Sequence, residues 1–232
     1  AIIMKRALDT LGSTADFIAL IGYKDSDTAP YESDMELLRT HGIITYTLPR
    51  LLETRHKLGF AEMALLKITP YSFTQYKRIQ FLDGDVMPTK NMDCFFELDM
   101  NAYTVGAVSP LNSGWYLAIP DMNAYIEMKE KALWRLRRDW DEINGWGEKM
   151  PPNMYYRGGK PCLKWLFNGA DMDQGLFTHY FIINHGNALL VDTEQRKARV
   201  FREGIAHAPG MEEPMGEALR CCKGVIPTAH YS

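Results

Sequence analysis

Residues 78–85, RIQFLDGD, constrain the fold of this chain more than any other segment. The apolar run 79–82 has no helical period, and it ends at two acids separated by one glycine, Asp83-Gly84-Asp85. Such a run is typical of a buried strand in a mainly parallel sheet. In open α/β sheets, ligands bind at the carboxyl ends of the strands. We therefore predict a strand over 79–82 that ends at a binding site.

Asp83 and Asp85 are candidate ligands of a cation. If the chain stays extended after the strand, alternation places both side chains on the same side, and Gly84 leaves room for a ligand. Two neighbouring carboxylates repel each other unless a cation lies between them. Oxygen ligands suit Mg²⁺ or Mn²⁺, which proteins commonly share with a substrate phosphate. The alternative is an ordinary strand-ending turn with two solvated aspartates.

Composition and charge argue against several classes of protein. The 232 residues carry a formal charge of -3, which argues against a general nucleic-acid binder and against attraction to anionic membranes. No run of about 18 apolar residues exists that would span a bilayer. The four cysteines form neither a disulfide framework nor a zinc-binding spacing, so we expect free thiols, which fit a reducing compartment weakly.

The other elements are predicted from periodicity and from the positions of glycine and proline. We expect strands over 16–23, 43–51, 103–110, 114–120, 187–192 and 198–201. We expect helices over 1–12, 32–42, 60–76 with a break at Pro70, 91–98, 121–140 with Asp121 as N-cap, and 170–181. Strands that alternate with helices indicate an α/β protein with a mixed sheet. Because such proteins usually begin with a strand, we expect this chain to be a fragment that lacks its first strand.

Residues 141–169 form a long loop, rich in Gly, Pro and Trp. A loop of this length inside a compact domain is usually functional or disordered. Its aromatic residues are Trp146, Tyr155, Tyr156 and Trp165. They could stack on a sugar ring or pack the loop against the protein, and the sequence does not decide between these alternatives.

Four blocks, in this order, resemble the glycogenin-like glycosyltransferases (glycosyltransferase family 8). The first covers 65–96, where Lys67 stands sixteen residues before Asp83, as a nucleotide-contacting lysine does in that family. The others are SPLNSGWYLAIP at 109–120, DMDQGLF at 171–177 and AHAPG at 206–210. The likeness extends over about residues 15–214, and its first block is the most specific.

The resemblance implies a GT-A fold, in which a Rossmann-like nucleotide-binding half has a mixed central sheet flanked by helices. One domain would cover 1–232, with a nucleotide-sugar half at 1–110 and an acceptor half at 111–232 that carries the loop insert 141–169. The implied activity is metal-dependent, retaining transfer of a hexose from a UDP-sugar to a carbohydrate or glycoconjugate acceptor. The hexose, the acceptor, the oligomeric state and the compartment, cytoplasm or Golgi lumen, stay open.

The resemblance also implies residue roles. The metal, Mn²⁺ or Mg²⁺, would be held by Asp83, Asp85 and His207. The sugar nucleotide would be bound by Lys67, Asp83, Asn112, Ser113, Gly114, Asp173 and Gly210. Asp173 and Gln174 would lie at the reacting centre, Gln174 in a positioning or charge-stabilising role. Simpler alternatives are that 112–114 is a turn between two strands and that Asp171 is only the N-cap of its helix.

Other functions compete with this hypothesis. Glu213 stands where the family has a lysine, and a carboxylate beside a phosphate is repulsive by about 1 kcal/mol at solvent-like dielectric; Lys223 is a candidate substitute. This departure and the absent first strand motivate a non-catalytic, sugar-nucleotide-binding or scaffold protein. A haloacid-dehalogenase-type phosphatase is less favoured, because Met87 stands where that class needs Thr or Val. A glycosidase needs carboxylates on both sides of a sugar bond, which Asp83 and Asp85 on one strand end cannot provide.

Overall fold

The computed structural model of the chain describes residues 1–22, 31–52, 59–156, 160–201, 211–222 and 225. Its strands are β1 (Ile18–Ile21), β2 (Ile44–Thr47), β3 (Ile79–Leu82), β4 (Ala102–Thr104), β5 (Asn112–Ala118), β6 (Ala188–Asp192), β7 (Lys197–Phe201) and β8 (Met211–Pro214). Its α-helices are α1 (Ile2–Thr10), α2 (Glu32–Thr40), α3 (Phe60–Leu65), α4 (Met122–Leu136), α5 (Asp173–Phe177) and α6 (Met215–Ala218). Three 3₁₀-helices are η1 (Leu66–Ser72), η2 (Asp93–Glu97) and η5 (Arg220–Cys222), and η4 (Thr178–Asn184) is a π-helix.

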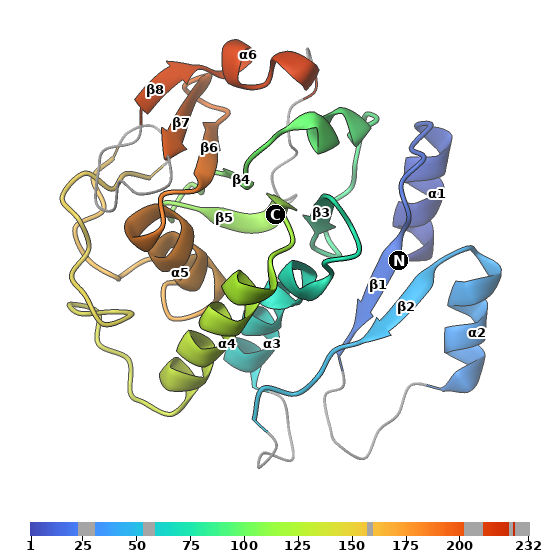
Figure 1. The fold of residues 1–232 in the computed structure, drawn as a ribbon, viewed down its shortest axis with the longest axis horizontal. Helices are drawn as coiled ribbons and strands as arrows, with labels where there is room; N and C mark the ends of the chain where they lie inside the picture. Colours follow the sequence, from blue (N-terminus) through green and yellow to red (C-terminus); the bar gives the residue numbers. More distant parts are fainter. Residues whose placement is uncertain (23–30, 53–58, 157–159, 202–210, 223–224, 226–232) are drawn as a thin grey trace.

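The described residues form a mixed α/β architecture with two sheets (Figure 1). The larger is a six-stranded mixed sheet in the order β3-β5-β4-β6-β7-β8, flanked by helices and compatible with a Rossmann-like fold. The smaller contains β1 and β2, paired in parallel, with α2 packed beside β2. Among the described helices, none combines the length and apolarity needed to cross a membrane.

The strand at 79–82 is confirmed, but its predicted setting in a mainly parallel sheet is wrong. In the six-stranded sheet only β4 and β6 pair in parallel, and every other neighbouring pair is antiparallel. β3 lies at one edge, where it pairs with β5 alone, and its four residues are half-buried. An edge strand can carry this mainly apolar run because Ile79 and Phe81 pack against one core and Leu82 packs against the other.

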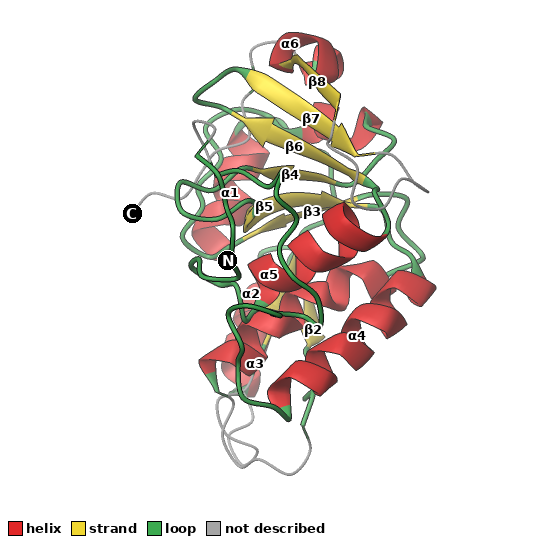
Figure 2. Cartoon of the chain, turned by 90° about the vertical axis from the view of Figure 1, so that its left-hand side faces the viewer, coloured by secondary structure: helices red, strands yellow, loops and turns green. Residues whose placement is uncertain are grey.

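The large sheet separates two apolar cores, as alternation along β5 illustrates. Tyr116 and Ala118 belong to one core, whereas Trp115 and Leu117 belong to the other. The first core contains buried residues of α4, α5 and the loop 141–169, and α3, α4 and α5 lie together on that side of the sheet in Figure 2. The second core receives buried residues from η2 and η5. The result is a central sheet covered on both faces.

Most predicted helices are confirmed. The differences lie where the chain forms the 3₁₀-helix η1 and the π-helix η4 in place of an α-helix. Asp121 caps α4 by accepting hydrogen bonds from the amides of Asn123 and Ala124. Pro70 was expected to break a helix, but α3 already ends at Leu65 and Pro70 lies inside the 3₁₀-helix η1. The helix expected at 170–181 begins at Asp173 and continues as the π-helix η4. β8 was not predicted at all.

The loop 141–169 is held down by two of its tryptophans. Trp146 and Trp165 are both fully buried in the first core. Their indole groups donate hydrogen bonds to the carbonyls of Ala170 and Glu148, each at 2.7 Å. For these two residues the packing alternative is therefore correct.

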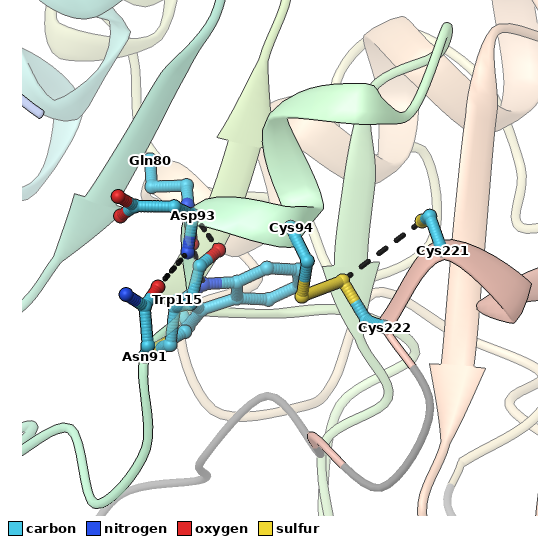
Figure 3. The surroundings of a disulfide bond; sticks show 8 residues. Gln80, Asn91, Asp93, Cys94, Trp115, Cys221 and Cys222 are labelled. Atoms are coloured by element: carbon cyan, nitrogen blue, oxygen red, sulfur yellow. Dashed lines mark hydrogen bonds between the residues drawn. A yellow bond between two sulfur atoms is a disulfide. The ribbon is translucent and has the colours of Figure 1, made fainter. Parts of the chain in front are cut away.

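The expectation of free thiols is wrong for two of the four cysteines. Cys94 on η2 and Cys222 on η5 form a disulfide across 128 residues of sequence (Figure 3). Cys162 and Cys221 are free. Sequence spacing did not indicate this bridge, because the two cysteines meet only through the packing of η2 and η5 in the second core.

Candidate functional site

An ammonium group between two carboxylates forms the centre of the candidate site. Lys67 Nζ lies 2.7 Å from Asp83 Oδ2 and 3.0 Å from Asp173 Oδ2. The hydroxyl of Ser113 donates a hydrogen bond to the same Asp173 oxygen at 2.6 Å. We call these four residues the ionic cluster. The cluster brings together three of the four sequence blocks.

Pairing between β3 and β5 sets the position of Asp83. The Asp83 amide donates to the carbonyl of Gly114 at 2.9 Å, which extends the ladder one residue beyond β3. Lys67 is fixed from the other side, because the hydroxyl of Tyr116 donates to its backbone carbonyl. The Lys67 ammonium also lies 5.7 Å from the centre of the Phe81 ring. Adjacent residues of β3 and β5 therefore hold both partners of this ion pair.

The Asp-Gln-Gly sequence at the start of α5 places Asp173 beside β5. Asp173 is only 4% exposed. Phe177, one turn later, packs against Tyr103 and Tyr116 with ring centres 5.6 and 5.4 Å away. At Gly175 an added Cβ would lie 1.7 Å from the Ala170 carbonyl oxygen, so this helix start requires a glycine. Packing of the helix therefore fixes the buried carboxylate.

The carboxylates of the cluster keep the Lys67 ammonium charged. Burial lowers the pKa of Lys67, but the carboxylates of Asp173 and Asp83 outweigh it and leave that pKa raised. The ammonium therefore stays protonated at neutral pH. One formal positive charge faces two formal negative charges in the cluster, with Asp85 close by in sequence. The predicted partner of Lys67 was a phosphate, whereas the structure pairs it with two carboxylates.

The geometry predicted for Asp83 and Asp85 from strand alternation is wrong. The chain turns directly after β3, and the Val86 amide donates to the Asp83 carbonyl at 3.0 Å. Residues 83–86 thus form a turn, as the simpler alternative expected, and Asp85 is exposed on it. Among the described residues, none has a heavy atom within 4 Å of a Cβ added at Gly84. A ligand can approach this turn from solvent.

The predicted metal site can be tested only in part. His207, Gly210 and Lys223 lie outside the described residues. Within the described part of the chain, no three His, Cys, Asp or Glu side chains form a group suited to a metal ion. Asp83 and Asp85 offer carboxylate oxygens at a solvent-facing turn, and this donor type fits a hard divalent ion. The complete site of Asp83, Asp85 and His207 stays a prediction.

Asn112, Ser113 and Gly114 begin β5, so the alternative of a turn between two strands is wrong. The side-chain oxygen of Asn112 accepts a hydrogen bond from the Gly114 amide at 2.8 Å. This bond holds the Asn112 side chain against the start of its own strand and engages its oxygen. Ser113 is buried and directed at Asp173. Its role in the structure is to position that carboxylate.

Gln174 is held between two neighbouring segments. In the amide orientation that satisfies its surroundings, its nitrogen lies within hydrogen-bonding distance of three acceptors: Ser109 Oγ at 2.6 Å, the Leu111 carbonyl at 2.9 Å and the Asn168 carbonyl at 3.1 Å. These contacts suit a positioning residue. Asp171 is not the helix cap, because Met172 occupies that position and the Asp171 carboxylate accepts from the Arg135 guanidinium at 2.8 Å.

A hollow of about 560 Å³ lies next to the segment that holds Gln174. Its lining residues are Ala107, Val108, Tyr156, Lys160, Leu166, Phe167 and Asn168. Of the four loop aromatics, only Tyr156 contributes to this wall. Leu166 and Val108 are 64% and 59% exposed, which makes the hollow open and partly apolar. Sequence analysis did not predict Phe167 or Lys160, because neither belongs to a recognisable motif.

Glu213, the residue that departs from the family pattern, lies on the outermost strand. It is paired with Ala198 of β7 in the β8 ladder. Its neighbour Glu212 forms ion pairs with Lys197 and Arg199, at 3.0 and 3.3 Å. The ion pairs of Glu212 therefore help to join β8 to β7.

No model of a known protein family matches the chain, and a search of curated proteins finds no match either. The function is therefore argued from the ionic cluster, the turn at 83–86 and the hollow beside Gln174.

Proposed function

We propose that the chain is a metal-dependent, retaining glycosyltransferase of GT-A type, similar to the glycogenin-like family, that transfers a hexose from a UDP-sugar. The observation that carries this proposal is the ionic cluster. Lys67, Asp83, Ser113 and Asp173 come from three blocks that resemble the family, and they converge on one point. The blocks were identified by residue type and order, so their convergence in space is an independent argument.

The turn at 83–86 is the proposed diphosphate side of the site. A divalent ion, held by Asp83, Asp85 and His207, would neutralise phosphate charge as a Lewis acid. The Lys67 ammonium would supply a second positive charge to the diphosphate. Two carboxylates, of Asp83 and Asp173, already hold this ammonium in place. A charge that is fixed in advance stabilises a departing diphosphate without reorganisation at the moment of reaction.

Asp173 and Gln174 form the proposed hexose side. Asp173 is buried and oriented by Ser113, so its carboxylate can accept a hydrogen bond from a sugar hydroxyl. Buried polar groups of this kind discriminate strongly against substrates that leave them unpaired. Gln174, anchored by the carbonyls of Leu111 and Asn168, would keep the reacting face of the sugar in register.

The hollow beside Gln174 is the proposed acceptor side. Tyr156 and Phe167 offer aromatic surface, on which the apolar faces of sugar rings stack. Lys160 and Asn168 offer hydrogen-bond donors for hydroxyl groups. A carbohydrate acceptor fits this mixture of aromatic and polar groups.

A non-catalytic sugar-nucleotide-binding protein is the second candidate. The observation that favours it is the double engagement of Lys67, because a diphosphate must compete with two carboxylates for the ammonium. Both candidates bind UDP, but only the transferase releases hexose from a UDP-sugar.

Hydrolysis of a panel of UDP-hexoses with Mn²⁺, together with calorimetric titration of UDP, tests the proposal. We expect turnover of at least one UDP-hexose, and a loss of about 100-fold or more in Asp85→Ala. The matched control is Asp99→Ala, another exposed aspartate. Activity that persists with a chelator would reject the metal-dependent mechanism. Tight UDP binding without turnover would favour the binding protein.

The disulfide bears on the compartment. Disulfides such as Cys94–Cys222 persist mainly in oxidising compartments. Of the two compartments that the resemblance left open, the proposal therefore favours the Golgi lumen.

A further inference from the structure

We propose that Cys221, Cys222 and Cys94 form an intramolecular thiol–disulfide exchange site. Cys221 Sγ lies 3.9 Å from Cys222 Sγ, and Cys222 is bonded to Cys94 (Figure 3). The three sulfur atoms lie in a row in this view, with that of Cys222 in the middle. This inference does not depend on the proposed glycosyltransferase activity.

Exposure separates the roles of the three cysteines. Cys221 is exposed, whereas Cys222 is 3% exposed and belongs to the second core. The Cys221 sulfur is therefore accessible from solvent, and a thiolate is the nucleophile in exchange reactions. The other free thiol, Cys162, is buried, and burial raises its pKa. Cys162 is thus a poor nucleophile and a suitable control.

The exchange step needs no external oxidant or reductant. The Cys221 thiolate attacks Cys222 Sγ, so the Cys221–Cys222 bond forms as the Cys94–Cys222 bond breaks. Cys94 leaves as a thiolate and takes up the proton that Cys221 lost. The number of thiols and of disulfides is unchanged, because the bridge only moves from a pair distant in sequence to a neighbouring pair. Cys222 Sγ is bonded to Cys94 and lies 3.9 Å from Cys221 Sγ, which matches the order of attacking, central and leaving sulfur in this step.

The exchange changes which segments are joined to η2. Asp93, adjacent to Cys94, accepts hydrogen bonds from the Ser13 hydroxyl at 2.6 Å and the Thr14 amide at 2.8 Å. η2 therefore anchors an N-terminal segment through Asp93 and the segment around η5 through Cys94. Moving the bridge to Cys221–Cys222 releases only the second anchor. The covalent link across 128 residues opens while the N-terminal contact remains.

Trapping of Cys94 tests this proposal. The oxidised protein is incubated without reductant at about pH 8 with limiting iodoacetamide, quenched in acid, digested with pepsin and mapped by mass spectrometry. We expect alkylated Cys94 together with a peptide that contains an internal Cys221–Cys222 disulfide. In Cys221→Ser, alkylated Cys94 should fall by about tenfold or more, because the attacking thiolate is absent.

The controls make every outcome decisive. Cys162→Ser should behave as the unmodified protein, and Cys221→Ala repeats the comparison without a hydroxyl in case the serine variant folds poorly. Equal alkylation of Cys94 with and without Cys221 overturns the proposal, whether that level is high or undetectable. A Cys94–Cys221 bridge in place of Cys221–Cys222 would also overturn it, because the attack would then fall on Cys94.

Discussion

The hydroxyl of Ser113 lies 2.6 Å from the carboxylate of Asp173, and this contact joins the start of β5 to the first residue of α5. The same carboxylate oxygen lies 3.0 Å from Lys67. One buried acid therefore connects a strand, a helix and η1. Substitutions at this point should affect binding and stability together.

Asp173→Asn should lower both UDP-hexose turnover and stability. The amide can still accept from Ser113, but it removes one of the two charges that hold Lys67. We expect at least about a tenfold loss of turnover and about 1–3 kcal/mol lower free energy of unfolding. Hydrolysis assays and urea unfolding measure the two effects. Asp99→Asn should change neither, and an unaltered Asp173→Asn protein would contradict the proposed role.

Lys67→Met should show a specific pH dependence of stability. The pKa of Lys67 is raised above its ordinary value of 10.5, so its contribution is complete below that pH and declines as pH rises through the raised value. The difference in unfolding free energy between the parent protein and Lys67→Met should therefore be constant from about pH 7 to about pH 10 and shrink above that range. Denaturant unfolding at several pH values gives this difference. Lys77→Met, at an exposed lysine, should show no comparable difference. If the difference in unfolding free energy between the parent protein and Lys67→Met grew at high pH, a protonated Lys67 that stabilises the fold would be refuted.

Gly175→Ala should disrupt the start of α5. The new methyl group would overlap the Ala170 carbonyl and lie 2.6 Å from Trp146 Nε1, so the helix start must shift away. We expect a loss of about 1–3 kcal/mol in unfolding free energy, as for other overpacked cores, and reduced turnover because Asp173 moves with the helix. The matched control is Gly216→Ala in α6, where an added Cβ has no heavy atom within 4 Å. A stability loss of the same size in Gly216→Ala would show that the effect is not steric.

Loss of the Cys94–Cys222 bridge should destabilise the protein. The bridge spans 128 residues. A disulfide that closes such a long loop stabilises the folded protein, because it restricts the unfolded chain. Cys94→Ser should lower the unfolding free energy by about 2–5 kcal/mol. Dithiothreitol should lower the stability of the parent protein and leave Cys94→Ser almost unchanged. Cys162→Ser should respond to dithiothreitol as the parent does.

Sequence periodicity predicted the elements that are specified locally. The Asp121 cap follows from a capping side chain, and β3 follows from a mainly apolar run that indicates a strand before its partner is known. β8 was missed because its residues, MEEP, show no apolar alternation. This strand depends on its neighbour, since Glu212 lies opposite Arg199 and forms ion pairs with β7.

Sequence analysis named residues of the candidate site, but it did not predict the contacts between them. The family resemblance selected Lys67, Asp83 and Asp173, and the structure brings these three side chains together. Their pairing with one another was not predicted, because it depends on how η1 and α5 pack against β5. The Asp83–Asp85 geometry failed for a local reason, since the Val86 amide donates a hydrogen bond to the Asp83 carbonyl and turns the chain where alternation assumed extension.

The pairing of β1 with β2 has a consequence for how the molecule opens. No third strand joins this pair within the described residues, and two strands of four residues are marginal by themselves. Side-chain contacts such as Tyr46 on Phe73, with ring centres 4.7 Å apart, tie the pair to the rest of the protein. Deuterium should therefore enter the amides of β1 and β2 well before those of β4 and β6, and gentle warming should melt this corner while the six-stranded sheet is still intact.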